Sequence, residues 1–456
     1  MYDLIYLFLW TLVPSTIYYY QGPLVSLFTL IFIYFLLNIL PLVFGLEPIK
    51  GKDSLFLCET PANKLLVTST AIFADKISLK KYKSCVNKSF KADPRTKKFL
   101  VTIFGRQYWK TDQNYNENNH YIVHSHRITK SSLENYITKI SNKDLNPNHP
   151  PYELHFFKNY ENKASAIVFK FHHSFADGLA IVSMMTWCAD ENSSKIFYSP
   201  KEIPLLKKLT LYILSILTII YYFFSTILQK ADKNSFHSQK LSGEKSISWT
   251  NKINLPKILI YCKQNSYTFN DLLTALVLES LQEYCKKPLG AVTATIPFSM
   301  RGQPKDGSFL KLENDLSVFP IEFPEVNQDL VANCSKIFNG LKSSIRPFVI
   351  ALMMRLGVNV LPKFLMQFIV FHVVNKATLL FSNVGGPKGP IFFGGVRFDQ
   401  IIGMSPNMAE CGISVTSFSY TDHFVVTCYA DKNRIRRPAE FIRILENKVR
   451  KKIANF

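Results

Sequence analysis

Charged residues are scarce in this chain, and their scarcity excludes several classes of protein. Asp, Glu, Lys and Arg make up 19% of the 456 residues, below the roughly 25% that is usual in soluble domains. Acidic residues are the scarcer kind, with 33 against 54 basic ones, and the net charge is +21. Because 47% of the residues are hydrophobic, a disordered chain is excluded and a fully soluble protein is not favoured.

Paired cysteines and several common motifs are also missing. The eight cysteines form no C-x-x-C or zinc-finger spacing, so we expect reduced, structural thiols in a protein that faces the cytosol. The glycine-rich segment 385–390 lacks the order of a phosphate-binding loop, and no Gly-x-Ser-x-Gly elbow of a serine lipase occurs. His120, His124 and His126 lie close together, but no cysteine pair or carboxylate completes a site, so we predict no metal.

Length and charge point to a large basic protein. A chain of 456 residues exceeds what one hydrophobic core usually organises, so we expect two domains or one large double domain. A chain that is both apolar and basic favours an anionic membrane surface or a phosphorylated ligand as its partner, and not nucleic acid. A basic surface that is merely solvated explains the charge equally well.

The N-terminal segment is strongly apolar. No charged residue occurs in 4–45, which a Gln-Gly-Pro turn signal divides into arms near 4–20 and 24–44. The pattern fits a helical hairpin, or one span together with an interfacial helix, and the second arm has the roughly 20 apolar residues that a bilayer core requires. Lys50 and Lys52 follow this arm, and by the positive-inside rule they place the rest of the chain in the cytosol.

Two further apolar runs occur. The run 209–228 is long enough for a transmembrane helix, whereas 349–374 contains Arg355, Pro362 and Lys363 and predicts a broken or membrane-dipping helix. Outside the apolar runs, strand-like segments such as 65–67 and 99–104 predict that the chain forms globular structure. We therefore divide the chain into an N-terminal membrane anchor at 1–50, a globular half at 51–200, an apolar linker at 201–245 and a second globular half at 246–456.

The most informative pattern follows a predicted strand at 166–171. The residues His-His-Ser-Phe-Ala-Asp-Gly occupy 172–178, and 179–185 predicts a buried helix. Adjacent residues on a strand point to opposite faces, so only one of His172 and His173 can face a given cleft, and the other must support it. An imidazole near neutral pH can accept a hydroxyl proton and return it to a leaving group, which suits acyl transfer.

The acidic and glycine residues of this pattern have structural explanations. Asp177 could orient the histidine base directly, or it could form a buried ion pair that holds the turn between strand and helix. Gly178 removes the Cβ that would crowd this turn.

The residues 172–178 match the HHxxxDG motif of the CoA-dependent acyltransferase superfamily, and the rest of the chain resembles the wax ester synthase/diacylglycerol acyltransferase family. Gly386 and Glu313 replace the proline and glycine that are usual in two of the blocks. The resemblance covers 51–456 through an ordered series of blocks: an opening region at 56–64, an Asn-Asp block at 269–275, a Pro-x-Ser-x-Arg block at 297–301, and segments at 313–317, 382–387 and 412–420.

The resemblance implies an α/β (α+β) fold of two chloramphenicol-acetyltransferase-like halves, with mixed sheets around a central tunnel and N-terminal membrane helices in addition. It implies direct acyl transfer without an acyl-enzyme, in which His173 is the general base and His172, Asp177 and Gly178 shape the site. No metal or cofactor is implied apart from acyl-CoA as co-substrate.

The second half is implied to complete the site. Asn270 would donate to the developing oxyanion while Asp271 holds its turn, although a helix cap ahead of 271–278 explains Asn270 equally well. Ser299 is a weaker oxyanion candidate and Arg301 a structural one, and both are weak candidates for contact with acyl-CoA.

A tunnel built from both halves constrains the run 209–228. A single crossing there would place the halves on opposite sides of the bilayer, so we predict that the run is interfacial, re-entrant or buried in protein. The leading hypothesis is a membrane-bound O-acyltransferase of the endoplasmic reticulum with its halves in the cytosol. It would transfer a fatty acyl group from acyl-CoA to a long-chain alcohol or diacylglycerol. The alternatives are acylation of a sterol or terpenoid, and a catalytically silent membrane protein that binds lipid.

Overall fold

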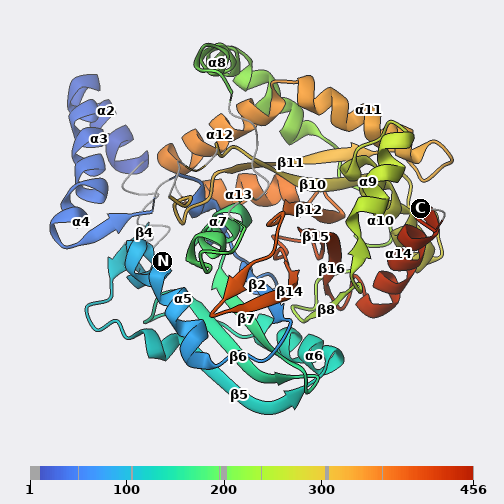
Figure 1. The fold of residues 1–456 in the computed structure, drawn as a ribbon. Coiled ribbons are helices and arrows are strands. Elements are labelled where there is room, and N and C mark those ends of the chain that lie inside the picture. Colours follow the sequence, from blue (N-terminus) through green and yellow to red (C-terminus); the bar gives the residue numbers. More distant parts are fainter. Residues whose placement is uncertain are drawn as a thin grey trace.

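The computed structural model describes residues 11–49, 51–103, 106–194, 196, 203–237, 239–302, 304, 308–361 and 363–454. These residues form two large mixed β-sheets with helices packed around them, one sheet in the lower part of Figure 1 and the other in its upper right. The fold class that the family resemblance implies, two α/β halves with mixed sheets, is confirmed.

The first sheet carries the strand that leads into the histidine motif. Its strand order is β13-β14-β2-β7-β6-β5, with β5 and β6 parallel and the other neighbours antiparallel. The central strand β7 is buried along nearly its whole length because its sequence is almost continuously apolar. The predicted strands at 65–67 and 166–171 and the helix at 179–185 are confirmed. The elements of this half are β2 (Leu66–Phe73), α5 (Leu79–Ala92), β5 (Tyr121–Ile128), α6 (Lys130–Ser141), β6 (Tyr152–Tyr160), β7 (Ala164–His172) and α7 (Gly178–Cys188).

The second sheet contains the larger hydrophobic core. Its order is β11-β10-β12-β15-β16-β8, and the short β9 also pairs with β16. The core lies between this sheet and its helices, with α10 buried along most of its length. The elements are β8 (Lys245–Trp249), β9 (Ile253–Asn254), α9 (Leu255–Gln264), α10 (Phe269–Cys285), β10 (Val292–Ser299), β11 (Leu316–Phe323), α11 (Leu330–Ser343), β12 (Leu379–Gly385), β15 (Ile413–Tyr420), β16 (His423–Asp431) and α14 (Pro438–Lys452).

The second half contributes two strands to the first sheet. β13 (Phe392–Phe393) and β14 (Val396–Ile402) come from the second half of the sequence but extend the first sheet, where β14 pairs with β2. The pairing joins Phe398 to Phe73 and Ile402 to Thr70. The segment 246–456 therefore supplies strands to both sheets, which ties the halves together.

The N-terminal apolar segment forms a helical hairpin that projects from the body at the upper left of Figure 1. Its helices are α2 (Val13–Gln21), α3 (Pro23–Asn38) and α4 (Leu40–Val43), and the Ser26 hydroxyl donates to the Pro14 carbonyl at 3.0 Å across the turn. Gly22 makes this turn with a φ of 85°. Of the two alternatives left open by the sequence, the described part favours the hairpin, while positions 4–10 of its first arm lie outside the described residues.

A small sheet joins the hairpin to the first half. It has the order β1-β4-β3, formed by β1 (Leu46–Pro48), β4 (Arg106–Thr111) and β3 (Lys98–Ile103), which confirms the strand predicted at 99–104 apart from Phe104, outside the described residues. The Tyr108 hydroxyl donates to the Leu37 carbonyl at 3.0 Å, and Arg106 donates to Asn38 Oδ1 at 2.6 Å. The end of α3 is therefore fastened to the protein body by buried polar contacts.

The run predicted at 209–228 forms α8 (Leu205–Leu228), which packs along α12 (Arg346–Val360). Its apolar side chains face outward, Leu217 being 73% exposed, whereas the small polar Ser215 and Thr226 face inward. Of the three predicted placements, burial in protein is therefore wrong. Within the part of the chain that the structure describes, two helical segments, Pro23–Val43 and α8, are long and apolar enough to cross a membrane.

The third apolar run is a broken helix, as predicted. It forms α12 and α13 (Lys363–Val374), which are separated at Leu361, while Pro362 lies outside the described residues. Both helices contact the 3-10 helix η2 (Gly51–Leu57), which leads toward the histidine motif.

Candidate active site

His173 follows directly on the end of β7. Its main-chain N–H donates to the Leu65 carbonyl at 2.8 Å, and its ring stacks on Phe56 of η2, with the centroids 3.9 Å apart. Burial lowers the pKa of His173 to about 4, although its own main-chain carbonyl and Asn314 act in the opposite direction. The ring is therefore neutral at physiological pH, which is the state that a general base requires.

His172 points toward a different set of partners. Its Nδ1 lies 2.7 Å from the Ser174 hydroxyl and its Nε2 lies 3.2 Å from Glu59 Oε1, which also accepts from the Leu65 N–H at 2.7 Å. Burial acts to raise the pKa of Glu59, but the interaction with His172 and further donors outweigh it, and the pKa lies below its ordinary value. His172 thus braces the opening segment against the end of β7, and its supporting role stays a prediction.

Asp177 forms a buried ion pair with Arg301, which is one of the two arrangements that the sequence left open. Arg301 Nε donates to the two carboxylate oxygens at 2.9 and 3.1 Å, and the two side chains are 6% and 5% exposed. Asp177 also caps α7 by accepting from the Ala180 N–H at 2.9 Å, and it accepts from the Asp315 N–H at 2.9 Å. Because Arg301 follows β10, this pair joins the two halves of the protein.

The expected crowding at Gly178 is not found. A Cβ built there would lie 3.6 Å from a methyl group of Val384, an ordinary contact, and the backbone does not adopt a positive φ. The prediction that glycine is needed to relieve the turn is therefore wrong. Gly178 begins α7 against β12, which belongs to the other half.

Asn270 is the second residue of α10 and does not cap it. The cap is Thr268, whose hydroxyl accepts from the Asp271 N–H at 3.3 Å while Asp271 accepts from the Thr268 N–H at 2.7 Å. The helix-cap explanation of Asn270 is therefore wrong, and Asp271 does hold the turn. Asn270 Oδ1 accepts from the Asn383 amide at 2.7 Å, and no hydrogen bond among the described residues joins it to His173.

Ser299 and Arg301 lie together at the end of β10. The Ser299 hydroxyl accepts from the Arg301 N–H at 3.3 Å, and Arg301 also donates to the Glu313 and Lys311 carbonyls. Arg301 is therefore occupied by protein partners. The predicted contacts of these two residues with acyl-CoA stay predictions.

The structure adds a polar network that the sequence did not single out. Asn314, which precedes β11, contacts His173 and receives support from Asp53 of η2, and Asp53 is paired with Arg95 at 2.6 Å. Residues 313–317 belong to a block that resembles the family, which was the available signal for Asn314. No local pattern indicates Asp53, because its partners lie far away in the sequence.

Lys52 is buried in the folded protein. Its ammonium donates to Asp315 Oδ1 at 2.8 Å and the side chain is only 8% exposed. It is therefore a buried ion-pair partner, and the cytosolic placement that the positive-inside rule predicts from Lys50 and Lys52 stays a prediction. Lys50 lies outside the described residues.

The clustered histidines of the first half are engaged by the protein. His120 Nδ1 lies 2.9 Å from the Tyr152 carbonyl, and His124 Nε2 lies 2.9 Å from the Tyr136 hydroxyl. His126 is exposed on β5. In the described ranges, no group of three or more His, Cys, Asp or Glu side chains is arranged to hold a metal ion.

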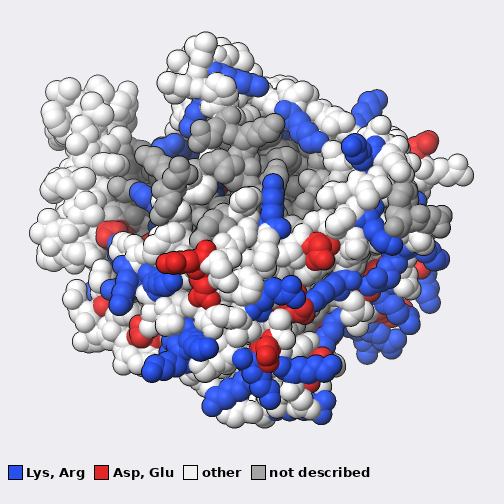
Figure 2. All heavy atoms as spheres, viewed as in Figure 1, with Lys and Arg blue, Asp and Glu red and all other residues white. Residues whose placement is uncertain are grey.

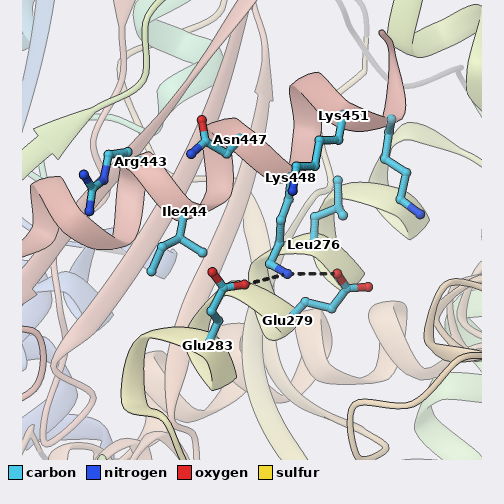
Figure 3. A pocket seen from close by; sticks show the side chains of 9 residues that line it. Leu276, Glu279, Glu283, Arg443, Ile444, Asn447, Lys448 and Lys451 are labelled. Atoms are coloured by element: carbon cyan, nitrogen blue, oxygen red, sulfur yellow. Dashed lines mark ion pairs between the residues drawn. The ribbon is translucent and has the colours of Figure 1, made fainter. Parts of the chain in front are cut away.

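A surface pocket of about 560 Å³ lies elsewhere, between α10 and α14. Figure 3 shows Lys448 between Glu279 and Glu283, with its ammonium 3.6 and 2.9 Å from their carboxylates. None of the predicted site residues lines this pocket. Its lining combines two glutamates with four basic side chains, of which Lys448 is paired with both glutamates. The histidine motif stays the candidate for the chemistry.

Family models match both halves of the chain. The family model of the wax ester synthase/diacylglycerol acyltransferase catalytic domain matches residues 51–208, and that of the WS/DGAT C-terminal domain matches residues 315–451. The chain belongs to the wax ester synthase/diacylglycerol acyltransferase family. It is accordingly an acyltransferase.

Individual members of the wax ester synthase/diacylglycerol acyltransferase family are distant in sequence. The chain is 21% identical over 386 residues to the O-acyltransferase WSD of Acinetobacter baylyi, covering 75% of this chain and 82% of that protein. It is 22% identical over 352 residues to wax ester synthase/diacylglycerol acyltransferase 2 of Arabidopsis thaliana, covering 67% and 73%.

Solved structures show the same fold. The wax ester synthase/diacylglycerol acyltransferase of Marinobacter aquaeolei VT8 superposes with a TM-score of 0.61 at 16% identity, over 90% of this chain and 100% of that one. A mutant starter condensation domain of rhizomide synthetase in complex with C8-CoA superposes with a TM-score of 0.56 at 9% identity, over 87% and 93%.

Proposed function

We propose that this member of the family is a membrane-bound O-acyltransferase that transfers a fatty acyl group from acyl-CoA to a long-chain alcohol or to diacylglycerol. The observation that carries the proposal is the neutral, half-buried His173 at the end of β7, in contact with residues of both halves. The printed names of the relatives, wax ester synthase and diacylglycerol acyltransferase, support the choice of acceptors.

The proposed reaction is a single displacement. His173 accepts the hydroxyl proton of the acceptor as its oxygen attacks the thioester carbonyl, and the C–S bond then breaks. The imidazolium returns the proton to the CoA thiolate, so the products are an ester and free CoA, with no acyl-enzyme and no metal. Because the Asn383 amide occupies Asn270 Oδ1, the Asn270 amide nitrogen is oriented away from that bond and can donate to the developing oxyanion.

Membrane attachment is supported by the outward apolar faces of α3 and α8. A surface helix normally buries its apolar residues, whereas α8 buries Ser215 and Thr226 and exposes its leucine, isoleucine and aromatic side chains. Figure 2 shows few charges over the hairpin, while basic residues gather over the lower half of the molecule. Such an outward apolar face can be buried at the boundary between headgroups and acyl chains, in the same membrane that holds long-chain alcohols and diacylglycerol.

We further propose that α8 lies in the membrane interface. Its C-terminal end is fixed to the body, since Lys376 donates to the Thr226 carbonyl at 3.0 Å and His372 contacts the Ile227 carbonyl at 3.1 Å. The two halves that α8 connects share the Asp177–Arg301 ion pair and the β2–β14 pairing, so they must lie on one side of the bilayer. Because acyl-CoA is anionic and water-soluble, we propose that both halves face the cytosol and that the membrane is that of the endoplasmic reticulum.

The test uses membranes from cells that express the wild type, His173→Ala or His126→Ala, the last being an exposed histidine of the same half. Labelled palmitoyl-CoA is supplied with hexadecanol, with dioleoylglycerol or with a sterol. We expect labelled wax ester or triacylglycerol with the wild type and with His126→Ala, and a loss of about 10²–10⁴-fold with His173→Ala. Labelling of the sterol alone would contradict the proposed acceptors, and full activity of His173→Ala would contradict the mechanism.

A further inference from the structure

The side chain of Asn314 makes three contacts that together involve the base and a buried ion pair. Its Oδ1 lies 3.1 Å from His173 Nδ1, and its Nδ2 lies 2.8 Å from the His173 carbonyl and 2.8 Å from Asp53 Oδ1. Asn314 is 5% exposed, and its main-chain N–H also donates to Asp53 Oδ1 at 2.7 Å. The amide is therefore held at both of its ends.

These partners determine which way the amide points. The His173 carbonyl is an acceptor only, and the Asp53 carboxylate accepts from Arg95 and from the Asn314 main chain, so both require the NH₂ end of the Asn314 side chain. The amide oxygen is then the end that faces His173 Nδ1. An amide oxygen cannot donate, so the ring nitrogen beside it must carry the proton.

We propose that Asn314 is a positioning residue that fixes His173 in the tautomer with the proton on Nδ1 and the lone pair on Nε2. This inference rests on the proposed acyl transfer with His173 as base. In that reaction Nε2 takes the acceptor's hydroxyl proton and later returns it to the CoA sulfur, while the proton on Nδ1 stays there and is donated to the Asn314 oxygen throughout. A ring in the other tautomer has no lone pair on Nε2 and cannot begin the reaction.

The arrangement also makes the base depend on the contact between halves. Asp53 and Arg95 belong to the first half of the sequence and Asn314 to the second, so the amide reaches His173 only when the halves are packed together. Arg95 neutralises Asp53 at 2.6 Å and donates to the Phe175 carbonyl at 3.3 Å. Burial raises the pKa of Asp53, while the Arg95 guanidinium and the donors from Asn314 act in the opposite direction. Each hydrogen bond that the structure describes to Asp53 comes from a donor, as a carboxylate requires, and this keeps the amide in one orientation.

The first experiment examines the unaltered protein. Histidine labelled with ¹⁵N is incorporated, the His173 signals are assigned from the spectrum of His173→Gln, and the shifts of the two ring nitrogens are measured at neutral pH. We expect a protonated Nδ1 and an unprotonated Nε2. A ring that carries its proton on Nε2, or on both nitrogens, would overturn the inference without affecting the family assignment.

The second experiment compares Asn314→Leu with the exposed control Asn339→Leu on α11. Leucine approximates the shape of asparagine but can neither accept nor donate. We expect Asn314→Leu to lower kcat by about 10-fold or more, less than the 10²–10⁴-fold attributable to the base itself, while KM for acyl-CoA changes less than about twofold. The ¹⁵N spectrum of the variant should show a mixture of tautomers, and the control should match the wild type.

Three further results are decisive. The His173 ring also interacts with its own main-chain carbonyl. If that interaction alone is enough to fix the tautomer, Asn314→Leu retains the wild-type spectrum and kcat, and the inference is wrong. If Asn314 is merely structural, the thermal midpoint and KM change but the tautomer does not, and the inference is again wrong. If the tautomer shifts as expected while neither wild type nor variant transfers acyl groups, the positioning role stands and the proposed function fails.

Discussion

Removing the carboxylate of Asp177 should destabilise the protein more than it alters the chemistry. In Asp177→Ala the guanidinium of Arg301, 5% exposed, loses its counter-charge, and breaking a buried pair by removing one partner costs about 3–5 kcal/mol. The loss of the helix cap on the Ala180 N–H adds about 1 kcal/mol. Since whole domains are stable by only about 5–15 kcal/mol, this variant should be close to unfolding at 37 °C.

The assay is urea unfolding of the solubilised protein, followed by tryptophan fluorescence, on Asp177→Ala, Arg301→Met and the double variant. The double variant leaves no orphaned buried charge, so we expect it to recover about half of the lost stability or more. The matched control is Asp399→Ala, which breaks the exposed pair between Lys252 and Asp399 and should cost less than about 1 kcal/mol.

Two outcomes would refute this reasoning. If Asp177→Ala unfolds within about 1 kcal/mol of the wild type, the pair does not hold the two halves as the buried geometry requires. If the double variant regains stability but remains inactive with normal acyl-CoA binding, the Asp177–Arg301 pair acts on the chemistry itself, and its assignment as purely structural is wrong.

Three other predictions follow from the site and its surroundings. Because burial holds the pKa of His173 at about 4, kcat/KM should stay level from pH 8 to about 5 and fall only as the pH drops through 4, and a fall centred near 6.5 would contradict this. Thr268→Ala should cost about 1 kcal/mol of unfolding free energy in the same urea assay, whereas Asn270→Ala should leave stability unchanged and lower kcat by about 10²–10³-fold. Leu217→Glu on the outer face of α8 should reduce co-sedimentation with phospholipid vesicles, while Leu259→Glu, an exposed leucine of α9, should not; equal binding of both variants would contradict the interfacial role.

The pH dependence of stability has a definite sign as well. The folded protein keeps His173 neutral, whereas the unfolded chain takes up a proton near the ordinary histidine pKa of about 6.5. Between about pH 6.5 and 4 the unfolded state therefore binds more protons, so the contribution of His173 to folding is lost as the pH falls through that window.

The motif was predictable because it is local. The strand β7, the turn at 172–178 and the start of α7 follow one another in the chain, and their apolar pattern and residue types indicate both the elements and the base. The family resemblance added the blocks from the second half, including the one that contains Arg301. The buried ion pair of Asp177 was one of two arrangements that the sequence allowed.

Contacts between residues far apart in the sequence were not predictable in the same way. Asn314 and Asp53 are 261 residues apart, and their hydrogen bond depends on how the two halves pack. Lys52 is a second example: nothing in its local sequence indicates that the fold buries it against Asp315. Likewise, Gly178 looks like a steric requirement in sequence, while the structure leaves room for a side chain.

The addition of β14 to the first sheet has a consequence for any attempt to divide the protein. A fragment that ends before residue 396 would leave β2 with β7 on one side and bare main-chain donors and acceptors on the other. An uncovered edge of this kind recruits strands from neighbouring molecules, so the isolated first half should aggregate instead of folding as a soluble domain. When the two halves are co-expressed as separate chains, β14 of the second should pair with β2 of the first, and we expect the halves to form a complex. A chain that ends before β14 should be degraded, because its first sheet is incomplete.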